Sequence, residues 1–194
     1  TPATAEFAKR FLASPHVMVA RGSLETLLKI CEHRLIGPRV QSIALYGCRL
    51  DHKLLPQLSK GLEYGICKRD LQGIRQARSR LQLFMDFLEE ELEFESNKGI
   101  FELLVNALRE IRSYGHSISL VVFADVYGEC QQQILGLQEA VEQISNDGVT
   151  RIKDKICRDG VRSSFNTLFA AAAKSGCCVH RFALEADESR TVID

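Results

Sequence analysis

The chain has 194 residues, of which 25 are basic and 25 acidic, so its formal net charge is zero. This length supports one hydrophobic core without disulfides or metals, and zero net charge excludes a global field that attracts nucleic acid or anionic membranes. The apolar runs are far shorter than the roughly 20 residues of a membrane-spanning helix, and no signal segment opens the sequence. We therefore expect one intracellular domain over residues 1–194, cytoplasmic or nuclear, with no nucleic-acid or membrane partner.

The seven cysteines are an odd and scattered set. Disulfides persist mainly in oxidising compartments, so the set indicates mostly buried thiols in a reducing compartment. Cys177 and Cys178 are adjacent and His180 follows two residues later, which does not fit the ligand spacing of a zinc site. We expect no metal and no cofactor.

In the first half of the chain, short apolar runs typical of strands alternate with segments whose apolar residues have helical spacing. Ser23 is the expected N-cap of a helix, because its hydroxyl can accept a backbone N–H, and Gly37-Pro38 ends that helix. Val17 and Val40, in the flanking strands, lie 23 residues apart, within the roughly 20 to 29 residues of a leucine-rich repeat. The expected elements are a helix at 3–12, strands at 16–20 and 40–46, the helix between those strands, and a short helix or loop at 51–62.

The longest periodic segment runs from Asp70 to Phe94. We expect one amphipathic helix whose apolar face packs in the core, because the run barely supplies the roughly three heptads that a coiled coil needs. The basic residues from Lys68 to Arg80 and the acidic residues from Glu89 to Glu95 are expected to be solvated faces of this helix, not a nucleic-acid patch or a cation site. The apolar face comprises Leu71, Ile74, Ala77, Leu81, Phe84, Leu88 and Leu92.

The second half repeats the order of helix then strand. A helix at 100–114 leads through Gly115 into a strand at 118–124, and a helix at 164–175 leads through Gly176 into a strand at 179–184. The continuous apolar run of the first of these strands predicts cover on both faces, as in central parallel strands. Between the two units we expect a helix at 131–144 and a polar connection at 145–159.

Strands that each follow a helix in the same order predict an α/β fold with a mainly parallel sheet. The distances between successive strands are uneven, which excludes a regular solenoid. We therefore predict an irregular leucine-rich-repeat-like arrangement of helix–strand units with long helical insertions.

The sequence contains no recognisable catalytic motif. It lacks a phosphate-binding loop and a Gly-x-Ser-x-Gly nucleophile elbow. The histidines lie at the edges of expected elements, where this residue is typically a partly exposed spacer. They are His16, His33, His52, His116 and His180. We therefore expect no enzymatic activity.

Binding is expected at the carboxyl ends of the strands, where open α/β sheets build their sites. The loops that would form this binding rim lie at 46–51, 125–129 and 185–188. A simple turn is the alternative interpretation of the second loop. The candidate anchors are Tyr46, Arg49, Asp125 and Tyr127.

Landmarks of a known family occur along the chain in that family's order. They are a phenylalanine-rich helix, a His-Phe-Met-Val-like strand, a Ser-Leu-x-x-Leu-x-x-Ile helix, a further strand and an Arg-Leu-Asp-like turn. Here they lie at Phe7–Val19, Ser23–His33, Val40–Leu45 and Arg49–Asp51, with later landmarks at 100–111 and 165–177. The chain thereby resembles the region C-terminal to the F-box in F-box domain-containing proteins of filamentous ascomycete fungi. It departs from them in having Arg34 where they often have Pro, and in lacking the Leu-Pro-x-Glu signature of the F-box itself.

The resemblance implies a substrate-recognition or scaffold part of an F-box protein in an SCF-type ubiquitin ligase. It implies a protein substrate as the partner, and an SCF adaptor only through an F-box upstream of Thr1. From the residues, two alternatives remain. One is a small α/β enzyme with its site at the same strand ends, and the other is a helical scaffold that dimerises through Asp70 to Phe94.

Overall fold

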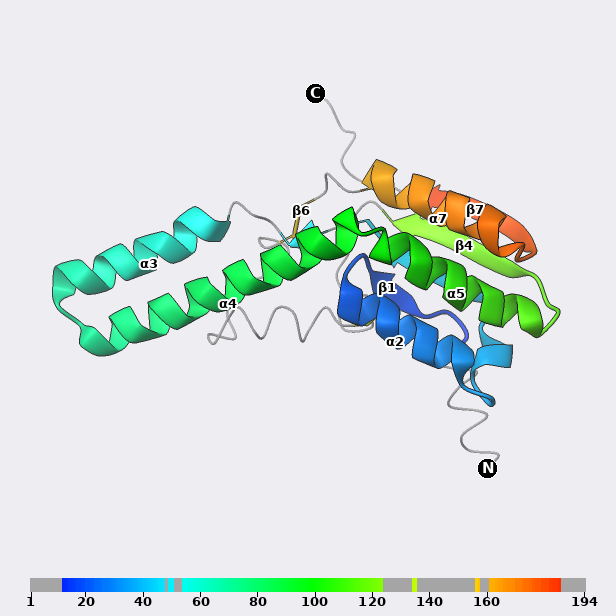
Figure 1. Cartoon of the computed structure of the whole chain (residues 1–194), viewed down its shortest axis with the longest axis horizontal. Helices are drawn as coiled ribbons and strands as arrows, with labels where there is room; N and C mark the ends of the chain where they lie inside the picture. The colour runs from blue at the N-terminus through cyan, green and yellow to red at the C-terminus, as the bar shows by residue number, and fades with distance from the viewer. Residues whose placement is uncertain are drawn as a thin grey trace, which may run out of the picture.

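The chain folds into an α/β layer from which a helical hairpin projects (Figure 1). The computed structural model describes residues 12–47, 49–50, 54–123, 134–135, 156–157 and 161–185. The strands are β1 (His16–Met18), β2 (Ser42–Tyr46), β3 (Arg49–Leu50), β4 (Ile118–Phe123), β5 (Ile134–Leu135), β6 (Ile156–Cys157) and β7 (Val179–Glu185). The helices are α2 (Arg21–Glu32), α3 (Leu54–Lys68), α4 (Leu71–Ser96), α5 (Gly99–Ser113) and α7 (Val161–Ser175), with a 3₁₀ turn η1 at Gly37–Arg39.

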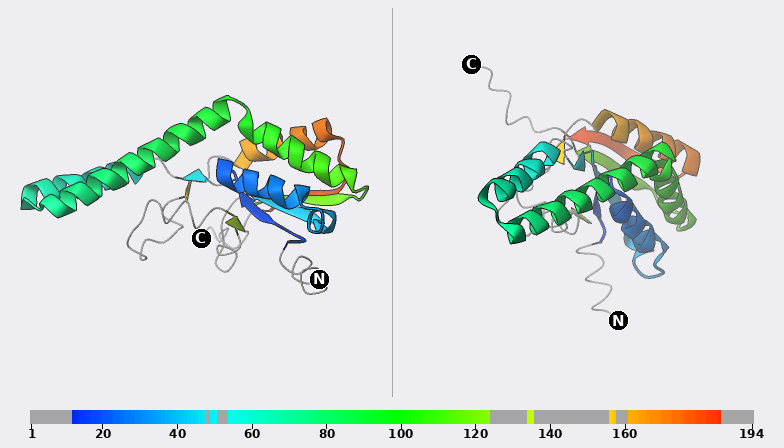
Figure 2. Two further views of the ribbon diagram at one scale, coloured as in Figure 1. Left: turned by 60° about the horizontal axis from the view of Figure 1, so that its bottom comes forward. Right: turned by 60° about the vertical axis from the view of Figure 1, so that its left-hand side comes forward.

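The main sheet has the strand order β5-β1-β2-β4-β7, and every neighbouring pair in it is parallel. Strands β3 and β6 form a separate antiparallel pair. In the main sheet β1, β2, β4 and β7 stand in chain order, and α2, α5 and α7 directly precede the last three of them. These helices lie side by side on one face of the sheet (Figures 1 and 2). The expected α/β class with a mainly parallel sheet is therefore confirmed.

The core lies between that face of the sheet and the three helices. Burial alternates along β4, where Leu120 and Val122 are completely buried and Val121 and Phe123 are half-buried. The cover that we expected on both faces is thus complete on the helix side and partial on the other. The helices contribute Leu24, Leu27, Cys31, Leu104, Leu108, Ile111 and Leu168 to this core.

Two side chains near the end of α5 hold the neighbouring helices in place. The Arg112 guanidinium donates to the carbonyl of Ser175, the last residue of α7, at 3.1 Å. The Tyr114 hydroxyl donates to the Cys31 carbonyl near the end of α2 at 2.9 Å. Both bonds satisfy carbonyls that a helix terminus leaves without an intrahelical partner. The three helices are therefore joined at one end as well as through their apolar faces.

The start of α2 differs from our expectation. The helix begins at Arg21, and Ala20 stands at the N-cap position, where its own side chain cannot cap the helix. Ser23 lies within the first turn, where its buried hydroxyl accepts the Met18 N–H at 3.3 Å and donates to the Leu135 carbonyl. The predicted N-cap role of Ser23 is wrong, because its hydroxyl joins α2 to β1 and β5 instead.

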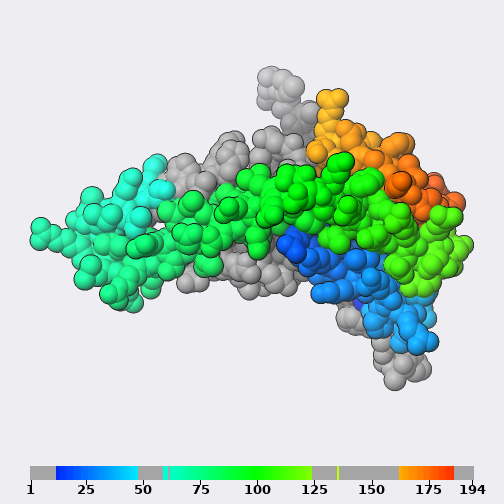
Figure 3. Space-filling view, viewed as in Figure 1, coloured from blue at the N-terminus to red at the C-terminus, as the bar shows by residue number. Residues whose placement is uncertain are grey.

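Helices α3 and α4 form the projecting hairpin, which we call the arm (Figures 1 and 3). Helix α4 is the single long helix that the periodicity predicted, and the Asp70 carboxylate caps it by accepting the Gln72 and Gly73 N–H groups at 3.1 and 3.0 Å. The predicted packing of its apolar face in the core is correct for Phe84, which is completely buried, and wrong for Leu71 and Leu92, which are 72% and 66% exposed. These two are exposed because α4 packs along α3 and extends away from the sheet.

In the second half of the chain, two of the expected helix–strand units are confirmed and one expected helix is not. Glycines with positive φ end both confirmed helices, Gly115 at +76° after α5 and Gly176 at +67° after α7, as a left-handed C-terminal residue requires. The helix predicted at 131–144 is wrong at Ile134 and Leu135, which pair with β1 as an edge strand. The rest of that segment, the helix expected at 3–12 and most of the connection at 145–159 lie outside the described residues.

Two of the four cysteines whose side chains the structure describes are buried. Cys31 and Cys177 are buried, whereas Cys67 and Cys178 are exposed, so the expectation of mostly buried thiols holds for two of these four. Burial raises the pKa of the Cys31 thiol to about 12, which keeps it protonated at neutral pH. None of the described helices combines the length and the apolar character needed to cross a membrane.

Candidate functional site

The carboxyl ends of the parallel strands meet at one edge of the sheet, where we expected a binding rim. Met18, Tyr46, Phe123 and Glu185 are neighbours in register across β1, β2, β4 and β7. Glu185 pairs at the surface with Arg181, whose Nη2 lies 3.3 Å from the Glu185 carboxylate. The strand ends are therefore aligned, and the residues that end them are apolar or aromatic except for this one ion pair.

Three aromatic rings pack together on the sheet face away from α2, α5 and α7. The rings of Tyr46 and Phe123 are stacked with centroids 5.0 Å apart, and His16 lies against both. His16 Nδ1 and the Tyr46 hydroxyl share a hydrogen bond of 2.9 Å. Burial lowers the pKa of His16, which favours its neutral form.

Tyr46, the first candidate anchor, lies at the end of β2 as expected but is only 2% exposed. Tyr46 and His16 are two titratable groups 2.9 Å apart, which falls within the range of about 2.6–3.2 Å that catalytic partners typically span. Catalysis also requires access for a substrate, and Tyr46 is buried. The geometry gives Tyr46 a packing role in the sheet.

The other candidate anchors are placed only in part. Arg49 lies in β3, where its backbone pairs with Cys157 of β6, and its side chain lies outside the described part of the structure. Asp125 and Tyr127 also lie outside the described residues, as do the loop at 125–129 and the residues after Glu185. The anchors are therefore not brought together within the part of the chain that the structure describes.

A cleft of about 410 Å³ lies where the arm meets the α/β layer. The ends of three helices form it, namely the start of α2, the end of α4 and the start of α5. Four carboxylates and one guanidinium line its polar wall, above the apolar side chains of Phe94 and Leu103. The lining residues are Arg21, Glu25, Glu90, Glu93, Phe94, Asn97, Gly99, Glu102, Leu103 and Asn106. The cleft is therefore acidic.

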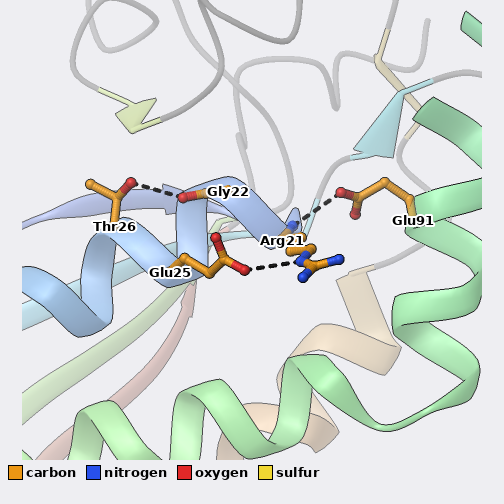
Figure 4. A network of polar contacts seen from close by, with 5 residues as sticks. All are labelled: Arg21, Gly22, Glu25, Thr26 and Glu91. Carbon is orange, nitrogen blue, oxygen red and sulfur yellow. Dashed lines mark hydrogen bonds and ion pairs between the residues drawn. The ribbon is translucent and has the colours of Figure 1, made fainter. Parts of the chain in front are cut away.

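Glu91 joins the two walls of this cleft (Figure 4). Its carboxylate Oε1 accepts the backbone N–H of Arg21 at 3.1 Å, at the helix start that Ala20 cannot cap. The Arg21 side chain pairs within α2 with Glu25 at 2.9 Å. Burial raises the pKa of Glu91, and the bond from the Arg21 N–H opposes that shift. The arm thus supplies the missing cap of α2 from 70 residues away in sequence.

Sequence reasoning missed the cleft. Glu90 and Glu93 were interpreted as part of a solvated helix face, and Arg21 and Glu25 carried no signal at all. The residues belong to segments that are distant in the sequence, so no local spacing predicts their proximity.

The arm carries most of the exposed apolar surface. Six of the nine large hydrophobic side chains that are exposed in the described residues lie on α3 and α4, with exposed fractions between 50% and 72%. They are Tyr64, Ile66, Leu71, Leu83, Met85 and Leu92. Exposed apolar side chains on a projecting element are typical of a contact surface.

Metal chemistry finds no support in the described residues, where no three His, Cys, Asp or Glu side chains are grouped so as to hold a metal ion. No protein-family model, curated protein or solved structure matches the chain. Its function therefore has to be inferred from its own geometry.

Proposed function

We propose that this chain is a non-catalytic protein-interaction domain. The observation that supports it best is the arm, which presents six exposed apolar side chains on two helices that project from the layer. An unpartnered apolar surface costs free energy in water and is typically retained where another protein covers it.

The α/β layer is the rigid support of this arm in the proposal. Its strands follow one another in the sheet, and the helix before each of β2, β4 and β7 lies on the same face. This order is typical of leucine-rich-repeat-like proteins, in which each unit packs on the previous one. We therefore extend the proposal to an irregular leucine-rich-repeat-like layer in which α3 and α4 are a long insertion.

Within this class, we propose the substrate-recognition or scaffold part of an F-box protein in a fungal SCF-type ubiquitin ligase. The order of helix and strand landmarks along the sequence supports it, and α2, β2, α5, β4, α7 and β7 follow in that order. The proposal places the protein in the cytoplasm or nucleus, with a protein substrate as its partner.

Affinity capture tests this assignment. The full-length protein that contains this chain is tagged, captured from its own cells and analysed by mass spectrometry. We expect the SCF adaptor and a cullin with the full-length protein, and neither with the 194-residue chain alone, because the adaptor contact needs the upstream F-box. Recovery of no adaptor or cullin with the full-length protein would overturn the ubiquitin-ligase assignment.

A variant of the arm tests the wider proposal of an interaction domain. Tyr64→Asp with Ile66→Asp places charges on exposed positions of α3, outside the surface of α4 that carries Leu71 and Leu92. We expect the full-length variant to keep the adaptor and to lose other captured proteins. An unchanged set of captured proteins would contradict the role of the arm in binding.

A further inference from the structure

The exposed apolar residues of α4 follow a seven-residue spacing. Leu71, Met85 and Leu92 are 72%, 50% and 66% exposed and lie 14 and 7 residues apart. Seven residues make nearly two helical turns, so these side chains form one stripe along the helix. Arg78 is the exposed residue that completes the repeat.

A second row runs beside this stripe. Ile74, Leu81 and Leu88 also repeat every seven residues and are half-buried. Helix α3 packs against this row at Ile74, because a Cβ placed on Gly65 of α3 would lie 3.1 Å from Ile74 Cγ1. Helix α4 therefore carries the two rows of a helix–helix seam, of which one is half-buried and the other is exposed.

The two halves of α4 carry exposed charges of opposite sign. Arg75 and Arg78 are exposed in the first half, and Asp86 and Glu89 are exposed in the second. Gln82 lies midway, because Arg75 and Glu89 stand seven residues from it, and Arg78 and Asp86 stand four. A helix with this symmetry is complementary to itself when two copies run antiparallel.

We propose that α4 binds α4 of a second copy of this chain in an antiparallel pair, with a two-fold axis near Gln82. In this arrangement Leu71 faces Leu92 of the other copy, and Arg75 faces its Glu89. The contact extends over about 30 Å of helix. A parallel pair would instead set the basic halves side by side and the acidic halves side by side, which is repulsive. The proposal does not depend on the F-box assignment.

The first measurement is the oligomeric state of the 194-residue chain. Sedimentation velocity from low micromolar to several hundred micromolar concentration is expected to show a monomer–dimer equilibrium that salt weakens, because the flanking ion pairs are exposed. A monomer at every concentration would overturn the proposal, and the surface would then belong to another protein or another segment.

Charge reversal tests the antiparallel register. Arg75→Glu and Glu89→Arg are each expected to raise the dimer Kd about tenfold, because each places like charges together twice in a two-fold dimer. The double variant R75E/E89R restores opposite charges across the axis, and its Kd is expected within about threefold of the parent value. A double variant that stays as weak as the single variants would overturn the antiparallel pairing.

A matched pair of apolar positions tests the stripe. Met85 and Leu83 are 50% and 53% exposed, yet they lie about 200° apart around the helix. Met85→Lys is expected to raise the Kd about a hundredfold, because the antiparallel register then places each new lysine opposite Arg78 of the other copy. Leu83→Lys is expected to leave the Kd within about threefold. Far-ultraviolet circular dichroism confirms that each variant is folded, and equal effects of the two substitutions would contradict the proposed interface.

Discussion

At the scale of single residues, burial changes the roles of side chains that look ordinary in the sequence. His16 is half-buried, in agreement with the partly exposed spacer that we expected, and it also holds a hydrogen bond of 2.9 Å to Tyr46, which is 2% exposed. Tyr46 was expected to be a surface anchor, and its ring packs against those of both His16 and Phe123. The position of Tyr46 at a strand end was therefore predictable, whereas its burial was not.

The lowered pKa of His16 predicts how stability depends on pH. Because burial disfavours the charged imidazole, the unfolded chain binds a proton more readily than the folded one between the folded pKa and 6.5. The free energy of unfolding is therefore expected to fall as the pH drops below 6.5. Urea titrations at several pH values measure this effect.

The His16→Gln variant isolates this contribution. Glu91 acts with the opposite sign, since its raised pKa adds stability as the pH falls toward 4.5. Subtracting the variant's pH profile from that of the parent protein cancels this opposing effect. A parent and a variant with equal slopes between pH 5 and 7 would contradict the role assigned to His16.

At the scale of elements, the helix start of α2 depends on a residue of another helix. Ala20 offers no cap, and the Glu91 carboxylate accepts the Arg21 N–H instead. A carboxylate at a helix N-terminus also interacts favourably with the helix dipole. The contact therefore holds the start of α2 and the base of the arm together.

Removing this cap is expected to cost stability. Glu91→Ala is expected to lower the free energy of unfolding by about 1 kcal/mol, the typical value of an N-cap. Glu91→Gln retains an acceptor and avoids a buried charge, so we expect a cost below about 0.5 kcal/mol. Urea unfolding measures both.

Glu90→Ala is the matched control for this experiment. Glu90 is the exposed neighbour of Glu91 on α4, and a surface substitution of this kind is expected to change stability by less than about 0.5 kcal/mol. A cost for Glu90→Ala as large as that for Glu91→Ala would show that the cap does not carry the effect.

At the scale of the whole molecule, the hydrophobic core and the exposed apolar surface occupy different parts. The core lies between the sheet and the helices α2, α5 and α7, whereas the arm carries exposed side chains. Leu108 of α5 is completely buried, and Leu92 of α4 is 66% exposed. Both residues are leucines on helices, and only the first belongs to the core.

Truncation of these two leucines is expected to lower the free energy of unfolding by very different amounts. Leu108→Ala is expected to cost about 2–5 kcal/mol, because it removes buried contacts and leaves a cavity. Leu92→Ala is expected to cost less than about 0.5 kcal/mol in the monomer. Denaturant unfolding at low protein concentration measures both, and a large loss from Leu92→Ala would contradict the exposed position of the arm.

The sequence by itself determined β2, β4 and β7, the helix before each of them and the parallel order of these strands, because these follow from local periodicity and turn residues. Helix α4, Gly115 and Gly176 are examples in which a short segment is sufficient. Only the tertiary structure decided which apolar faces are covered. The seven-residue pattern of α4 is the same whether a sheet, α3 or a second chain covers it, and the acidic cleft joins Arg21 to Glu93 across distant segments. Such partners depend on long-range packing, which local sequence patterns do not specify.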